Sequence, residues 1–105
     1  PAARPAPPPP QVAGAALRSA FTERDRALYQ DCLDKTMRAP VGRVWRWRNR
    51  QSGNGGSMAP TTPPQMAGGQ SCRSFRETIT LKDGRTESFT GQACQRADGS
   101  WNIVA

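Results

Sequence analysis

The chain has 105 residues and a formal net charge of +7, with 15 Lys and Arg against 8 Asp and Glu. It contains no histidine, the residue most often used as a general base or metal ligand, and no apolar run approaches the roughly 20 residues that cross a bilayer. The length allows one small domain, whose core would be marginal without a covalent or metal staple.

The first 20 residues predict an extended arm. Six of the first ten residues are proline, which favours polyproline II over hydrogen-bonded structure. We expect a semi-rigid spacer over residues 1–20, with a proline motif that docks on a partner as the alternative. Residues 11–20 are small and weakly helical, so they form either linker or an early helical turn. The folded domain is expected over residues 21–105.

Residues 21–37 predict the clearest helix of the chain. Thr22 can cap its N-terminus, and Glu23 and Asp25 place carboxylates in the first turn, where the helix dipole favours them. One largely apolar stripe recurs at helical spacing: Leu28, Tyr29, Cys32, Leu33, Thr36 and Met37. Because Cys32 lies within this stripe, a small buried thiol is favoured over a reactive one.

The period then changes to that of a strand, over residues 43–50. Tryptophan and arginine alternate from residue 45 on, so the tryptophans point to one face of the predicted strand and the arginines that alternate with them point to the other. These faces hold Trp45 and Trp47 on one side and Arg46, Arg48 and Arg50 on the other. Residues 51–57 are rich in glycine and predict a turn or loop. Residues 58–70 contain three prolines, which permit an edge strand or an extended loop but not a central strand.

Residues 71–95 predict a β-hairpin. A three-residue loop, Lys82-Asp83-Gly84, would place Gly84 in the left-handed conformation. This register sets Phe75 opposite Gly91, where the ring can cover bare backbone, and it collects apolar residues on one face. They are Phe75, Ile79, Leu81, Phe89 and Ala93. A two-residue turn is the alternative, and it would shift the pairing of the two strands.

A second turn at residues 97–99 and a closing strand at residues 100–104 complete the predicted elements. Trp101 and Ile103 share one face of that strand by spacing. The sequence therefore predicts an α+β fold, with an N-terminal helix packed on a small antiparallel β-sheet of three to four strands.

The hairpin register brings Cys72 opposite Cys94, although on the face away from the phenylalanines unless a bulge precedes Cys94. A cross-strand disulfide there would stabilise the fold by roughly 3 kcal/mol in the chain-entropy model. It would also indicate an oxidising compartment, the bacterial envelope or the outside. Two reduced core cysteines are the alternative. With Cys32 left over, no CxxC and no histidine, we expect neither a zinc site nor a cofactor.

The excess charge is confined to one window. Residues 35–76 hold eight basic residues and no acid, whereas the rest of the chain sums to a charge of −1. Arginine suits bidentate contacts with phosphate or carboxylate, and Arg alternating with Trp suits anionic surfaces. The candidate anion- or partner-binding residues are Arg43, Arg46, Arg48, Arg50, Trp45 and Trp47. A merely solvated strand face is the alternative, and an oxidising compartment disfavours nucleic acid as the partner.

No catalytic residues emerge from the sequence, and no small-molecule substrate. Ser and Thr have no base to activate them, and the Gly-rich segment at residues 53–56 lacks the Lys of a phosphate loop. Glu77 and Glu87 share a face of the predicted hairpin, and a carboxylate pair can do acid–base chemistry. Since arginines flank both, we interpret them as salt-bridged surface residues.

Several short motifs follow in order between residues 25 and 104. Together they resemble the C-terminal domain of the 17 kDa surface-antigen family of bacterial outer-membrane proteins. The motifs include Trp47-Arg48-Asn49, Ser52-Gly53-Asn54-Gly55-Gly56-Ser57, Cys72-Arg73-Ser74-Phe75, Gly91-Gln92-Ala93-Cys94-Gln95 and Asp98-Gly99-Ser100-Trp101. The resemblance implies an envelope protein and supplies no catalytic residues. Neither a lipid-bearing cysteine nor a glycine zipper occurs in this sequence.

Three functions follow as hypotheses. The first is a non-enzymatic cell-envelope module with a structural or binding role, peripheral to the membrane, whose partner is an envelope protein complex or an anionic envelope component. The second is an accessory subunit that docks on a larger membrane complex through the Pro-rich arm and the sheet. The third is a basic nucleic-acid-binding module. We expect location in the periplasm or outer membrane, after export by a targeting segment upstream of Pro1.

Overall fold

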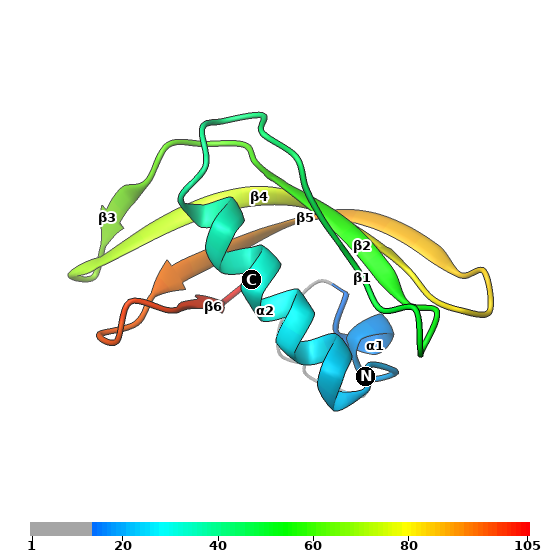
Figure 1. Ribbon diagram of the computed structural model, residues 1–105. Helices are drawn as coiled ribbons and strands as arrows, with labels where there is room; N and C mark the ends of the chain where they lie inside the picture. Colours follow the sequence, from blue (N-terminus) through cyan, green and yellow to red (C-terminus); the bar gives the residue numbers. More distant parts are fainter. Residues whose placement is uncertain (1–13) are drawn as a thin grey trace, which may run out of the picture.

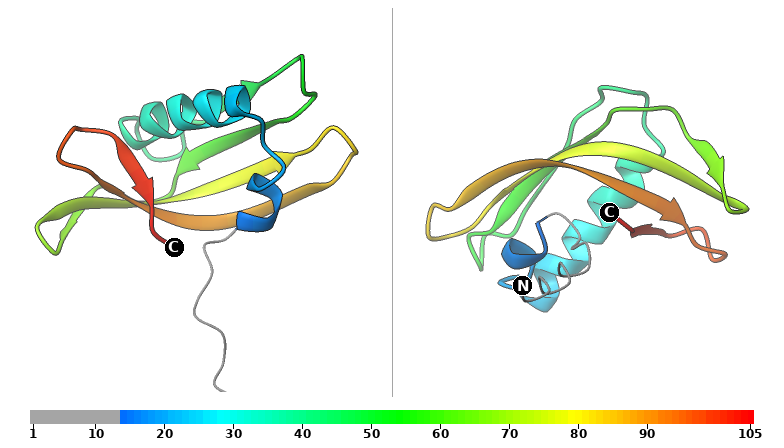
Figure 2. Two further views of the ribbon diagram at one scale, coloured as in Figure 1. Left: turned by 90° about the horizontal axis from the view of Figure 1, so that it is seen from below. Right: turned by 180° about the vertical axis from the view of Figure 1, so that it is seen from behind.

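The computed structural model describes residues 14–105, so residues 1–13 of the predicted arm lie outside it. The described elements are α1 (Ala15–Arg18), α2 (Glu23–Met37), β1 (Trp45–Arg48), β2 (Gly55–Pro60), β3 (Gln65–Ala67), β4 (Gln70–Thr80), β5 (Thr86–Gln95) and β6 (Trp101–Ile103). All strands pair antiparallel in one sheet of order β1-β2-β4-β5-β6, with β3 against β4. The sheet curls around α2, which lies along its inner face (Figures 1 and 2).

The predicted helix and the α+β class are confirmed. The Oγ1 of Thr22 accepts from the Asp25 N–H at 3.1 Å, while an Asp25 carboxylate oxygen accepts from the Thr22 N–H at 2.9 Å. This reciprocal capping box fixes where α2 begins. The stripe that the sequence predicts then enters the core through Tyr29, Leu33 and Met37.

The core lies between α2 and the inner face of the sheet. Phe21 and Tyr29 stack edge-on against Trp47, with ring centroids 5.1 and 6.1 Å apart from it. Phe75 and Ile79 of β4 are fully buried beneath the helix. Because side chains alternate along each strand, these inner residues leave the opposite, outer face of the sheet to polar side chains.

The strand count is the main error in the predicted fold, because the sheet has six strands in the described residues rather than three to four. The predicted loop at residues 51–57 is confirmed for residues 51–54 and wrong from Gly55 on. The prediction of no central strand in residues 58–70 is wrong, since β2 lies between β1 and β4. At Gly56 an added Cβ would lie 2.5 Å from the Thr78 carbonyl oxygen, so only glycine allows the strands to approach this closely. Pro60 is the last residue of β2, where the missing N–H does little harm.

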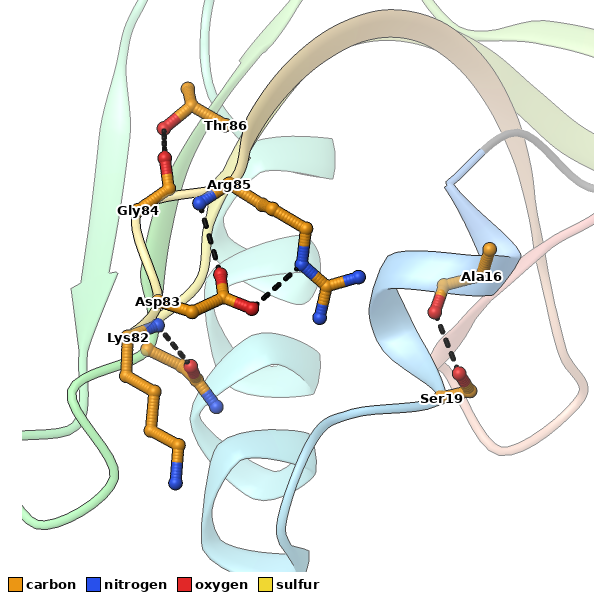
Figure 3. Close-up of polar contacts among 8 residues, drawn as sticks. Ala16, Ser19, Lys82, Asp83, Gly84, Arg85 and Thr86 are labelled. Atoms are coloured by element: carbon orange, nitrogen blue, oxygen red, sulfur yellow. Dashed lines mark hydrogen bonds and ion pairs between the residues drawn. The ribbon is translucent and has the colours of Figure 1, made fainter.

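The hairpin of β4 and β5 forms in the predicted register. Phe75 pairs with Gly91, and the pairing runs without a bulge from Thr80 opposite Thr86 to the two cysteines. In the turn, Gly84 has φ of +91°. Figure 3 shows that Asp83 accepts two hydrogen bonds from Arg85, from its backbone N–H at 3.0 Å and its Nε at 2.8 Å. The three-residue loop is therefore confirmed over the two-residue alternative.

Residues 15–18 adopt the helical turn that the sequence leaves as one of two alternatives. This short helix, α1, buries Leu17 in the core and holds the Arg18 guanidinium 5.8 Å from the ring centre of Phe89. Phe89 projects from the inner face of β5, so α1 covers the part of the sheet that α2 leaves open. In residues 14–105, no helix combines the length and the apolar character needed to span a membrane.

Candidate functional site

The outer face of the sheet carries arginine and hydroxyl side chains in two adjacent rows. In the first row Arg46 pairs with Ser57, which pairs with Thr78. In the second, Arg48 pairs with Gly55, which pairs with Thr80. These residues enclose an open depression of about 340 Å³. Guanidinium groups beside hydroxyls match the oxygen-rich surface of an anionic ligand.

The predicted binding residues separate into three environments. Arg46 and Arg48 are exposed on the outer face, as the alternation predicts, but β1 spans only Trp45–Arg48, so Arg50 is in the following loop. Trp47 is buried, with its ring packed in the core against Phe21 and Tyr29. Trp45 is half-buried, with the Arg43 guanidinium 5.2 Å and the Lys35 Nζ 5.6 Å from its ring centre. The rows of the outer face therefore include only two of the six.

The basic window is only partly at the surface. Arg73 is 5% exposed, and it donates to the Thr62 carbonyl at 2.6 Å and to the Met37 carbonyl at 2.8 Å. It thus ties the end of α2 to the segment after β2. Lys35 forms an ion pair with Asp31 at 2.9 Å. Six exposed arginines remain, and within residues 14–105 none of them forms an ion pair: Arg38, Arg43, Arg46, Arg48, Arg50 and Arg76.

The β1–β2 loop is held by one buried carboxylate, that of Asp25. It accepts from Asn49 at 2.8 Å, Ser52 at 2.7 Å and Asn54 at 2.8 Å, in addition to the Thr22 N–H of the capping box. Burial alone would raise the pKa of Asp25, but these donors outweigh it and lower the pKa to about 2. Asn49, Ser52 and Asn54, which belong to the motifs that resemble the surface antigens, therefore fix this loop from within.

Glu77 corrects a prediction, because it is buried and not a surface residue. It is 1% exposed, on the inner face between Phe75 and Ile79. Its Oε2 lies 3.6 Å from Nη1 of Arg18, the residue that ends α1. Burial raises the pKa of Glu77 to about 7, against the lowering effect of Tyr29 and Arg18. Glu87, by contrast, is exposed, so the two carboxylates lie in different environments.

Acidification is expected to stabilise the fold through Glu77. The folded state holds the proton of Glu77 more tightly than the unfolded chain, whose pKa is near the ordinary 4.5. The contribution of Glu77 to stability is therefore fully present below 4.5 and is lost as the pH rises through 7. Unfolding in urea should show a gain of about 2 kcal/mol between about pH 7.5 and about pH 5.5.

Glu77→Gln should remove this slope, and Glu87→Gln, an exposed carboxyl on the neighbouring strand, should keep it. The chain has no histidine to titrate in the same window. A Glu77→Gln protein with the wild-type pH dependence would contradict the assignment.

The cysteines form the pair that the hairpin register predicts. Cys72 and Cys94 are joined by a disulfide with an S–S distance of 2.10 Å. Cys32 is a free thiol buried in the core, and burial raises its pKa to about 11. It is therefore protonated at neutral pH and lacks the character of a nucleophile.

Fold and surface define a small disulfide-bonded α+β domain with a basic outer face. In the described residues no group of three or more Cys, Asp or Glu side chains is placed to hold a metal ion. Residues 36–102 match the family model described as the 17 kDa outer membrane surface antigen. The chain belongs to this family, whose description implies a location in the cell envelope.

Two relatives illustrate the extent of the similarity. The 17 kDa surface antigen of Rickettsia prowazekii is 32% identical over 83 residues, which cover 78% of this chain and 52% of that protein. The 17 kDa surface antigen of Rickettsia bellii is 30% identical over 89 residues, 84% of this chain and 55% of that protein. The chain thus spans about half the length of the curated relatives it matches. No solved structure matches it.

Proposed function

We propose that this chain is a non-catalytic module of the bacterial cell envelope that binds an anionic envelope component through its outer face. One observation carries the proposal: Arg46 and Arg48 project side by side over a hydroxyl-lined depression, with no ion pair to neutralise them in residues 14–105. The window around them contains no acidic residue. An anion would supply the counter-charge that the fold leaves out.

The disulfide and the family support the proposed location. A disulfide persists outside the reducing cytosol, so the module would be in the periplasm or at the outer membrane after export, and peripheral to the membrane. The family and the two relatives are described as surface antigens, and neither description names a reaction. Docking on a membrane complex through the Pro-rich arm concerns residues largely outside the described part and stays a prediction.

The double substitution Arg46→Gln and Arg48→Gln tests the proposal. Binding to inorganic polyphosphate and to phosphatidylglycerol vesicles should weaken roughly thirtyfold, because each arginine near an anionic surface contributes about 1 kcal/mol. Isothermal titration and vesicle co-sedimentation measure the two affinities.

The matched control removes two arginines elsewhere. Arg24→Gln with Arg26→Gln takes the same charge from the exposed side of α2. It should lower both affinities only slightly, through net charge. Equal losses for the two double variants, or no loss for the first, would reject the outer face as the binding site.

A further inference from the structure

The α2–β1 loop, residues 38–44, projects at the end of the molecule opposite α1 (Figure 1). It contains a tight turn, in which the Arg43 N–H donates to the Pro40 carbonyl at 3.1 Å and Gly42 has φ of +86°. No described non-glycine residue has positive φ, so this is a type II turn with Val41 at its corner. The Gly42 N–H also donates to the Pro60 carbonyl at 2.9 Å, which fixes the turn to the end of β2.

The fixed turn displays apolar side chains to solvent. Val41 is 53% and Val44 47% exposed. The other exposed large apolar residues of the described chain are isolated from this loop in the sequence, Met66 in β3 and Val104 near the C-terminus. Because the turn is already fixed by these hydrogen bonds, binding through the loop would lose little conformational entropy.

Exposed arginines flank the two valines along the chain. Arg38 is the C-cap of α2 and the first residue of the loop, Arg43 is in the turn, and Arg46 follows on β1, all of them exposed. Trp45 comes next to Val44, and its half-buried ring lies near the Arg43 guanidinium and the Lys35 Nζ. Two exposed valines, flanked in the chain by exposed arginines and an amphipathic tryptophan, match the boundary between lipid headgroups and acyl chains in charge and polarity.

We infer that the α2–β1 loop inserts Val41 and Val44 into the surface of an anionic phospholipid bilayer. The inference rests on the proposed function and names its ligand. The arginines of the loop and of the outer face bind lipid phosphates, and the two valines pack against the acyl chains near the headgroups. A soluble polyanion offers only the first of these contacts, so the valines distinguish the two sources of phosphate.

The test compares two probes. The double variant Val41→Ser and Val44→Ser should bind mixed phosphatidylglycerol–phosphatidylcholine vesicles about tenfold more weakly, because each half-exposed valine loses part of the free energy of burial. It should bind inorganic polyphosphate as the wild type does. Met66→Ser removes another exposed apolar side chain, on β3, and it should leave both affinities unchanged.

The outcomes separate this inference from the proposed function. Unchanged vesicle binding of the valine variant would overturn loop insertion, and the loss for Arg46→Gln with Arg48→Gln would still uphold the anionic site. A wild type that binds polyphosphate but not the vesicles would overturn the lipid assignment alone. Wild-type binding of the arginine variant to both probes would reject the proposed function itself.

Discussion

Replacing Asp25 with alanine is expected to destabilise the protein by about 3–5 kcal/mol, the cost typical of removing one partner from a buried charged network. The side chain is fully buried and accepts hydrogen bonds from three side chains and one backbone N–H. Its loss removes the capping-box acceptor of the Thr22 N–H at the start of α2 and leaves Asn49 and Asn54 with buried, unpaired amide groups. Urea unfolding followed by circular dichroism measures the change.

Asp31→Ala is the control, since Asp31 is on the same helix but exposed, and its ion pair with Lys35 should contribute below about 1 kcal/mol. A second signature is the response to acid. The depressed pKa of Asp25 contributes about 2 kcal/mol above pH 4, and this is lost as the pH falls through 2. The alanine variant should lack this loss. A variant as stable as Asp31→Ala would contradict the role assigned to Asp25.

Loss of the disulfide is expected to cost roughly 3 kcal/mol, because the bridge closes a loop between residues 22 apart and restricts the unfolded chain. The double variant Cys72→Ser and Cys94→Ser should therefore unfold at a clearly lower urea concentration, with the same native circular dichroism spectrum. Reduction of the wild type by dithiothreitol should give the same midpoint as the variant.

The double variant is also the control for the reductant. It has no disulfide, so the midpoint of its urea unfolding should be the same with and without dithiothreitol. The buried Cys32 remains in both proteins and cancels from the comparison. Identical midpoints for the oxidised wild type and the double variant would show that the bridge does not stabilise the fold.

Local signals explain the parts of the fold that the sequence predicts. The capping residues and apolar stripe of α2 depend on neighbours within a few positions, as does the Lys82-Asp83-Gly84 turn. Once that turn is placed, the register of β4 and β5 follows by counting. β2 has no such signal, because Gly55 and Gly56 are poor strand formers by propensity and are selected by their close approach to Trp47 and Thr78 across the sheet.

The candidate site was predictable to a similar extent. Alternation along β1 identifies Arg46 and Arg48 as outward-facing, but it cannot show that a helix covers Trp47. The burial of Glu77 was visible in the sequence, since it occupies the position between Phe75 and Ile79 on the predicted apolar face. Its flanking arginine suggested a surface salt bridge instead. The convergence of Asn49, Ser52 and Asn54 on Asp25 joins positions far apart in the chain, and no local pattern signals it.

The hydrogen bonds that Asp25 accepts limit what membership of the family says about binding. Asn49, Ser52 and Asn54 belong to motifs by which the chain resembles the surface antigens, yet they are bonded to a carboxylate that no solvent reaches. Selection for stable folding would preserve this buried hydrogen-bond network whatever the outer surface binds. Two homologues could then share this interior while their outward arginines are exchanged freely, so binding preference has to be measured separately for each protein.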